Sequence, residues 1–212
     1  MARRRLSNGA GGASTSPPPP PPSAPPAPAP PPAPAPASVL AVFGSGGHTA
    51  EMLSLLAALP AARYGPRSYA AADSDSTSEA RAKASGAVPR DAAFLRLPRA
   101  REVGQSYLTA LFSTLLALLA ALRLLLRVRP RLVLVNGPGT CLPVCAAAVA
   151  LRALRLLPRD ARVLFVESAC RVETLSATGR LCYALGLADA VLVQWPQLLR
   201  KYPRAECVGL LS

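Results

Sequence analysis

Short apolar runs alternate with segments of helical spacing along most of the chain. Runs rich in strand-forming residues occur at residues 38–43, 68–72, 94–97, 132–135, 162–166, 190–193 and 207–210. Segments with apolar positions three or four residues apart predict helices at 49–59, 79–85, 107–126, 142–157 and 175–187, with a short helix up to Tyr202. Strands that alternate with helices indicate an α/β, Rossmann-like fold, in which a mostly parallel sheet has helices on both faces.

The first 37 residues do not share this pattern. From Pro17 to Ala37 the chain is almost entirely proline and alanine, and a Gly/Ser stretch precedes this tract. Such a composition cannot form a packed core, so we expect residues 1–37 to be disordered with polyproline II character. No apolar run follows the arginines near the start, which argues against a signal peptide. The predicted folded domain spans residues 38–212.

Polar residues and glycines follow the predicted strands. They occupy residues 44–48, 73–77, 136–140, 167–171 and 194–195. In a parallel sheet the carboxyl ends of the strands meet at one edge, and ligands bind beyond that edge. The pattern therefore predicts a functional site there.

The turn after the first strand is rich in glycine and ends in the only histidine of the chain, His48. A strand, a glycine turn and a helix N-terminus together suit a phosphate group, although a plain turn between strand and helix is the alternative. It is not a complete dinucleotide fingerprint, because Thr49 stands where the third glycine should be, and no Lys-Ser/Thr pair of a P-loop follows. His48 is a candidate general base, with a structural histidine as the alternative.

The segment 107–126 is the most hydrophobic of the chain. Leucines and Phe112 form one stripe at helical spacing, small residues form the opposite face, and arginines flank both ends. Its uncharged run is shorter than the roughly 20 residues that span a bilayer. We expect a helix that packs on the sheet and dips into a membrane surface, where its arginines meet lipid phosphates. A fully buried crossover helix is the alternative.

The formal net charge of +13 favours anionic partners such as phosphorylated substrates or anionic lipid. Nucleic acid is disfavoured, because aromatic residues make up only 5% and do not alternate with basic residues. The five cysteines are irregularly spaced without a C-x-x-C pair, so we expect no zinc or other metal, no cofactor, and free thiols in a reducing compartment.

Four motifs in order carry a resemblance to a known family. They are Phe43-Gly44-Ser45-Gly46-Gly47-His48-Thr49, Asn136-Gly137-Pro138-Gly139-Thr140-Cys141, Val166-Glu167-Ser168 followed by Cys170-Arg171-Val172-Glu173-Thr174-Leu175, and Val193-Gln194-Trp195-Pro196. From residue 39 to its end the chain closely resembles the membrane-anchoring subunit of the UDP-N-acetylglucosamine (UDP-GlcNAc) transferase of the dolichol pathway, the asparagine-linked glycosylation protein fourteen family.

The resemblance implies the amino-terminal, acceptor-side half of a split GT-B glycosyltransferase that is inactive alone. A separate catalytic subunit, asparagine-linked glycosylation protein thirteen, would bind UDP-GlcNAc. The complex would act at the cytosolic face of the endoplasmic reticulum membrane. It would add the second GlcNAc, in a β1,4 link, to the dolichol-linked acceptor GlcNAc-diphosphodolichol during protein N-glycosylation.

The resemblance also implies roles for individual residues. The implied catalytic residues are His48 and Glu167, with a helix-capping carboxylate as the alternative for Glu167. The acceptor diphosphate would be bound by Gly44, Ser45, Gly46, Gly47, Thr49, Asn136, Gly137, Gly139 and Thr140. Membrane contact is expected at Leu111, Phe112, Leu115, Leu119, Arg123 and Arg127 in the helix described above. The partner would be held by Val208, Gly209, Leu210 and Leu211.

Two other functions fit part of the sequence. The chain could be a membrane scaffold that recruits the catalytic subunit without a chemical role, or a dinucleotide-binding oxidoreductase with Asp73 on the ribose.

One departure from the family concerns the start of the chain, where members usually have a hydrophobic anchor and this sequence has the Pro/Ala tract. Either the helix at 107–126 makes the membrane contact, or the start of this sequence comes from an alternative or mispredicted first exon.

Overall fold

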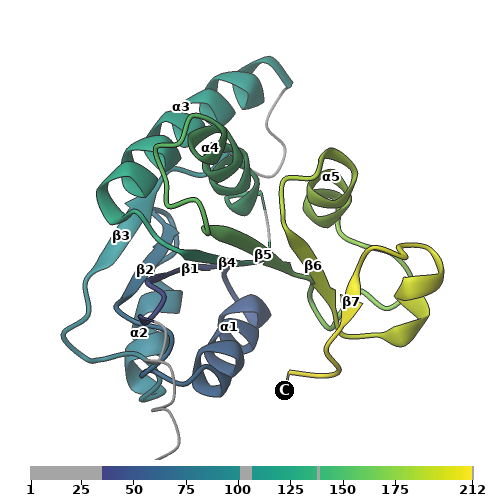
Figure 1. Ribbon diagram of the computed structural model, residues 1–212, viewed down its shortest axis with the longest axis horizontal. Coiled ribbons are helices and arrows are strands. Elements are labelled where there is room, and N and C mark those ends of the chain that lie inside the picture. Colours follow the sequence, from purple (N-terminus) through teal and green to yellow (C-terminus); the bar gives the residue numbers. More distant parts are fainter. Residues whose placement is uncertain (1–34, 101–106, 138, 212) are drawn as a thin grey trace, which may run out of the picture. The chain divides into compact units, whose positions relative to one another are not determined.

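The computed structural model describes residues 35–100, 107–137 and 139–211, with only the backbone described for 107–111. Among these residues seven strands form one sheet (Figure 1). The strands are β1 (Val39–Phe43), β2 (Arg67–Ala72), β3 (Phe94–Leu97), β4 (Leu132–Asn136), β5 (Arg162–Val166), β6 (Ala190–Val193) and β7 (Glu206–Cys207). The Rossmann-like fold class predicted from the alternation of elements is confirmed.

The sheet has the strand order β3-β2-β1-β4-β5-β6-β7, and every neighbouring pair is parallel. The chain runs outward from β1 to β3 and then returns to the other side of β1 with β4. The order therefore reverses between β1 and β4, which opens a crevice at their carboxyl ends. The turn that follows β1 and the turn that follows β4 both lie at this switch point.

Helices cover both faces of the sheet (Figure 1). They are α1 (Gly47–Ala58), α2 (Thr77–Ala84), α3 (Tyr107–Val128), α4 (Cys141–Ala153) and α5 (Ala177–Leu185), with a short 3₁₀ helix at Pro196–Arg200. The period of two in the strands separates two cores, because successive side chains point to opposite faces. In β1, Leu40 and Val42 pack with α3, α4 and α5, whereas Val39 and Phe43 pack with α1 and α2.

Several predicted boundaries are wrong for identifiable backbone reasons. The helix predicted at 142–157 ends at Ala153, and Arg155 beyond it has a positive φ of 59°. The helix predicted at 175–187 is shorter at both ends, because Ser176 caps its start and Gly186 ends it in the left-handed conformation. The last strand covers only two residues, and Val208 continues it with a single hydrogen bond to the carbonyl of Val193.

Helix α3 buries one face and exposes the other, so the fully buried alternative is wrong. Ala117, Ala121 and Leu125 are buried against the sheet, as the small-residue face predicted. The predicted membrane residues whose side chains are described are all exposed: Phe112, Leu115, Leu119, Arg123 and Arg127. The side chain of Leu111 lies outside the described residues. Of the predicted disordered segment 1–37, residues 1–34 also lie outside them. None of the helices within the described ranges is long and apolar enough to cross a membrane.

Candidate active site

The turn after β1 presents backbone groups to solvent at the switch point. Ser45, Gly46 and Gly47 are exposed, and Gly46 takes a φ of 69°, which glycine adopts without strain. No side chain caps the N-terminus of α1. Its first N–H groups and the positive end of its dipole are therefore available to an anion.

The turn after β4 lies beside it and has a similar form. Gly137 has a φ of 107°, Gly139 and Thr140 are half-buried, and no side chain caps α4. Capping differs at two other helices that begin at this edge. In α2, N–H groups of Thr77 and Ser78 donate to a carboxylate, and in α5 the hydroxyl of Ser176 accepts from Gly179. Of these four helices, α1 and α4, which flank the switch point, are the two whose first N–H groups are not bound by a side chain.

His48 stands between the two turns. A Cβ atom on Gly137 would lie 2.7 Å from the imidazole ring, so the ring packs directly on the backbone of the second turn. The side chain remains 27% exposed, and Nδ1 lies 3.5 Å from Oε2 of Glu51. His48 is thus held on one side and open to solvent on the other, as a group that exchanges a proton with a substrate must be.

Glu51 connects three strand-end segments, and our reading of the sequence missed it. Its Oε2 accepts a hydrogen bond from Nδ2 of Asn136 at 2.8 Å. Its Oε1 accepts from the hydroxyl of Ser168 at 2.9 Å and from the N–H of Ala169 at 2.8 Å. The available signal was its position three residues after His48 on a helix, a spacing that places two side chains on one face.

The pKa values of this pair shift in opposite directions. The carboxylate of Glu51 raises the pKa of His48 above its usual 6.5, against partial burial, which lowers it. Burial raises the pKa of Glu51, but the nearby His48 and the hydrogen bonds from Asn136, Ala169 and Ser168 together outweigh burial and lower it to about 2. Glu51 is therefore ionised at neutral pH. Its stabilising contribution is present above the unfolded value near 4.5 and is lost as the pH falls towards 2.

A second network holds the glycine turn from the side of α2. The hydroxyl of Thr49 donates to the carbonyl of Gly44 at 2.8 Å and lies 2.8 Å from the hydroxyl of Ser78. Ser78 in turn donates to the buried carboxylate of Asp75. Thr49 is 1% exposed, and its N–H points to the carbonyl of Gly46. Thr49 thus supports the turn from beneath, as does the buried Gly44, and their predicted contact with the diphosphate stays a prediction.

Two further predicted site residues are fully enclosed. Asn136 has no exposed surface and holds Glu51, so its side chain positions the site rather than meeting a diphosphate. Glu167 is 1% exposed, and its two carboxylate oxygens accept from the N–H groups of Ser168 and Ser176. This carboxylate holds the N–H of Ser176 at the start of α5, as the helix-capping alternative expects, and the catalytic role of Glu167 stays a prediction.

Two buried side-chain polar atoms among the described residues have no hydrogen-bond partner, and both belong to this site. They are Nδ1 of His48 and Oδ1 of Asn136. Unpaired buried polar atoms are costly, so each needs a physical explanation. Both residues contact Glu51, Asn136 through its Nδ2 and His48 through Nδ1 at 3.5 Å.

The predicted partner segment lies at the far side of the same edge. Val208 and Leu210 are exposed, whereas Gly209 and Leu211 are half-buried. The N–H of Leu211 donates to Oε1 of Gln194, whose Nε2 donates to the carbonyl of Glu167. The terminal segment is therefore tied to the loop that carries Ser168 and Ala169. In the described ranges no cluster of three or more His, Cys, Asp or Glu could hold a metal.

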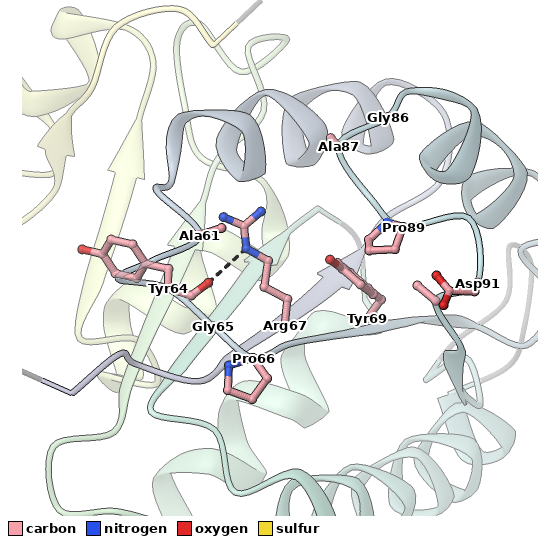
Figure 2. A pocket seen from close by; sticks show the side chains of 11 residues that line it. Ala61, Tyr64, Gly65, Pro66, Arg67, Tyr69, Gly86, Ala87, Pro89 and Asp91 are labelled. Carbon is pink, nitrogen blue, oxygen red and sulfur yellow. Dashed lines mark hydrogen bonds between the residues drawn. The ribbon is translucent and has the colours of Figure 1, made fainter.

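A hollow of about 650 Å³ lies at the opposite edge of the sheet, where β2 begins (Figure 2). Tyr64, Arg67 and Tyr69 line it, and the guanidinium of Arg67 donates to the carbonyls of Tyr64, Leu56 and Leu59. The bonds to Leu56 and Leu59 satisfy carbonyl groups at the C-terminal end of α1. None of the predicted site residues lines this hollow, so it is separate from the candidate site at the switch-point edge.

Solved structures share the Rossmann-like, GT-B type of fold seen in this domain. The structure is similar to the crystal structure of Acinetobacter baumannii MurG, with a TM-score of 0.57 and 20% identity over 82% of this chain and 45% of that chain. It is also similar to LpCGTa in complex with UDP, with a TM-score of 0.50 and 15% identity over 84% of this chain and 53% of that chain. At such identities the likeness defines the fold alone. The chain spans about half the length of either structure.

Sequence comparison identifies the family. The family model "Oligosaccharide biosynthesis protein Alg14 like" matches residues 39–211. The chain is 43% identical over 180 residues to "UDP-N-acetylglucosamine transferase subunit ALG14" of Rattus norvegicus, covering 81% of each chain. It is 42% identical to the human protein of that name, over 81% of this chain and 82% of that one, and 38% identical to the Yarrowia lipolytica protein, over 82% and 80%. The chain belongs to the Alg14-like family, which confirms the resemblance seen in its motifs.

The close packing of His48 on Gly137 makes a matched pair of substitutions informative. Gly137→Ala places a Cβ atom against the imidazole at a backbone angle that alanine rarely adopts, so we expect the ring to move and the domain to lose about 1–3 kcal/mol of stability. Gly139→Ala meets no atom within 4 Å and should change stability by less than about 0.5 kcal/mol. Urea unfolding measures both, and equal losses would contradict the packing described.

The contact between Glu51 and His48 predicts a shift that one NMR signal reports, because His48 is the only histidine. The Glu51 carboxylate raises the histidine pKa, so Glu51→Gln should lower it towards 6.5. A titration of the imidazole resonances between pH 5 and 9 measures this change. Glu79→Gln removes a carboxylate that pairs with Lys83 instead and should leave the titration unchanged. Identical midpoints in wild type and Glu51→Gln would refute the pairing.

Proposed function

We propose that this chain is the acceptor-binding subunit of a two-chain UDP-GlcNAc transferase. A separate catalytic subunit of the asparagine-linked glycosylation protein thirteen family binds the donor. The names of the relatives support the subunit role, and a GT-B enzyme needs a second domain to enclose its substrates. The chain spans 45% of the MurG chain, as one such domain would. The exposed side chains of Val208 and Leu210 in the terminal segment are available to the partner.

The acceptor is GlcNAc-diphosphodolichol. The two open helix N-termini and the exposed Ser45, Gly46 and Gly47 supply backbone N–H groups and positive dipole ends suited to a diphosphate. Gly139 and Thr140 flank the same crevice from the second turn. The arginine-rich net charge of +13 attracts such an anionic lipid.

The observation that carries the chemistry is the His48–Glu51 pair beside this turn. The neutral imidazole of His48 accepts the proton from the 4-hydroxyl of the acceptor sugar. The acceptor oxygen then attacks C1 of the donor GlcNAc, the bond from C1 to the UDP oxygen breaks, and UDP leaves with that electron pair. Inversion at C1 gives the β1,4 link. Glu51 orients the ring and stabilises the imidazolium that forms.

Membrane contact is made by the exposed face of α3 at the cytosolic side of the endoplasmic reticulum. Phe112 is 65% exposed, Leu115 51% and Leu119 44%, and together they form an apolar stripe on one face of the helix. Exposed Arg123 and Arg127 continue the stripe and suit lipid phosphates. Such a stripe on an exposed face indicates a surface that meets an apolar partner.

The transfer assay tests the proposed activity. The chain and its candidate catalytic partner are co-expressed, and transfer from UDP-GlcNAc to GlcNAc-diphospho-lipid is measured for each protein and for both. We expect transfer only from the complex, and a loss of about 10²–10⁴-fold in kcat with His48→Ala while the complex remains intact. The rate should rise with pH through the His48 pKa, which lies above 6.5.

Other outcomes of this assay are equally clear. Unchanged turnover with His48→Ala would remove the chemical role and leave a scaffold that recruits the partner. No transfer from a stable complex would refute the proposed activity. Absence of any complex would refute the subunit proposal.

Vesicle binding tests the α3 surface. We expect the chain to float with vesicles of phosphatidylcholine and phosphatidylserine, and Leu115→Glu combined with Leu119→Glu to reduce the bound fraction about tenfold, because charged groups oppose insertion. Leu185→Glu, at a 65% exposed position on α5, is the matched control and should bind like wild type. Equal losses in the two variants would contradict a contact specific to α3.

A further inference from the structure

One arginine beside the glycine turn has no acidic partner. On α2, Lys83 lies 2.7 Å from Glu79, and Arg96 of β3 pairs with the same carboxylate. Arg81 on the same helix is exposed and forms no ion pair within the described part of the chain. Its Nη1 instead lies 3.4 Å from the carbonyl oxygen of Gly46. The guanidinium is therefore held at the turn by one long, exposed hydrogen bond.

A hollow of about 650 Å³ adjoins this arginine. Gly46 and Gly47 line one side of it, Arg81 and Ser85 line the other, and Ala50 and Leu53 contribute apolar surface. The hollow lies between α1 and α2, whereas His48 lies against Gly137 on the side of β4. The exposed part of the turn thus separates an arginine from a histidine.

The exposed turn carries no cationic side chain of its own, since it consists of Ser45, Gly46 and Gly47. A helix N-terminus supplies only about half a positive charge. A sugar diphosphate lipid carries two negative charges at neutral pH. His48 faces Glu51, which already compensates its charge when it is protonated. Arg81, beside the turn, is a cation placed to compensate the rest.

We propose that Arg81 is the residue that binds the acceptor diphosphate, a role that rests on the proposed function of the turn. Its guanidinium leaves the carbonyl of Gly46 and forms two hydrogen bonds to one phosphate group, the geometry that arginine favours. Only one weak bond is given up, because the present contact is long and open to water. With one phosphate beside Arg81 at the α2 side of the turn, the rest of the diphosphate extends along the turn towards the N-terminus of α4. The acceptor sugar then lies beside His48, and the orientation of the substrate is set.

Kinetics of the complex test this assignment. Initial rates are measured against the concentration of GlcNAc-diphospho-phytanyl acceptor. Arg81→Ala should raise the KM for acceptor about tenfold and change kcat less than twofold, since binding is lost but the proton transfer is not. Arg81→Lys keeps the charge and loses the planar fork, so we expect an intermediate KM. Lys83→Ala removes the same charge from the same helix and should match wild type.

A binding measurement separates this inference from the proposed activity. Inorganic pyrophosphate is titrated into the full chain, and the amide signals of Gly46 and Gly47 are followed by NMR. We expect Arg81→Ala to weaken pyrophosphate binding at least fivefold relative to wild type and to Lys83→Ala. Equal binding by all three, or an unchanged acceptor KM in Arg81→Ala, overturns the role of Arg81. Absence of transfer by the wild-type complex with normal binding of pyrophosphate overturns only the proposed activity.

Discussion

The contacts of the Glu51 carboxylate with three strand-end segments are the interactions on which the rest of the site depends. The carboxylate accepts hydrogen bonds from Asn136 at the end of β4 and from Ser168 and Ala169 after β5, and it faces His48 on its own helix. These donors lower its pKa to about 2, so it is a fixed negative charge in the neutral range. A charge held by three segments fixes the geometry of all three and sets the basicity of the histidine.

Within the turn after β1, some residues are buried and hold it in place, whereas their neighbours are exposed to solvent. Thr49 and Gly44 are buried and bonded to the network of Ser78 and Asp75, whereas Ser45, Gly46 and Gly47 face solvent. Rigid support beneath an open backbone is what a site needs in order to bind an anion without reorganising. The open N-termini of α1 and α4 fit this division, because neither helix uses a side chain to satisfy its first N–H groups.

Much of the architecture followed from local pattern. The alternation of apolar runs and helical segments predicted β3, β5 and β6 to the residue, and the small-residue face of α3 predicted the side that meets the sheet. Helix ends were less predictable. Arg155 has a positive φ, which an arginine in the sequence does not predict. The short strand β7 pairs with β6 alone. The site edge was also predictable, because the glycine turns and His48 follow strands of a parallel sheet.

The sequence by itself thus determined the sheet, the two glycine turns, the single histidine between them and the family. Only the tertiary structure decided which of the nearby polar residues face a ligand. Asn136 and Ser168 lie 85 and 117 residues from Glu51 in the chain, so no local pattern could reveal their hydrogen bonds to it. The burial of Thr49, Asn136 and Glu167, and the position of the Arg81 guanidinium beside Gly46, likewise arise from elements that come together only in the folded sheet.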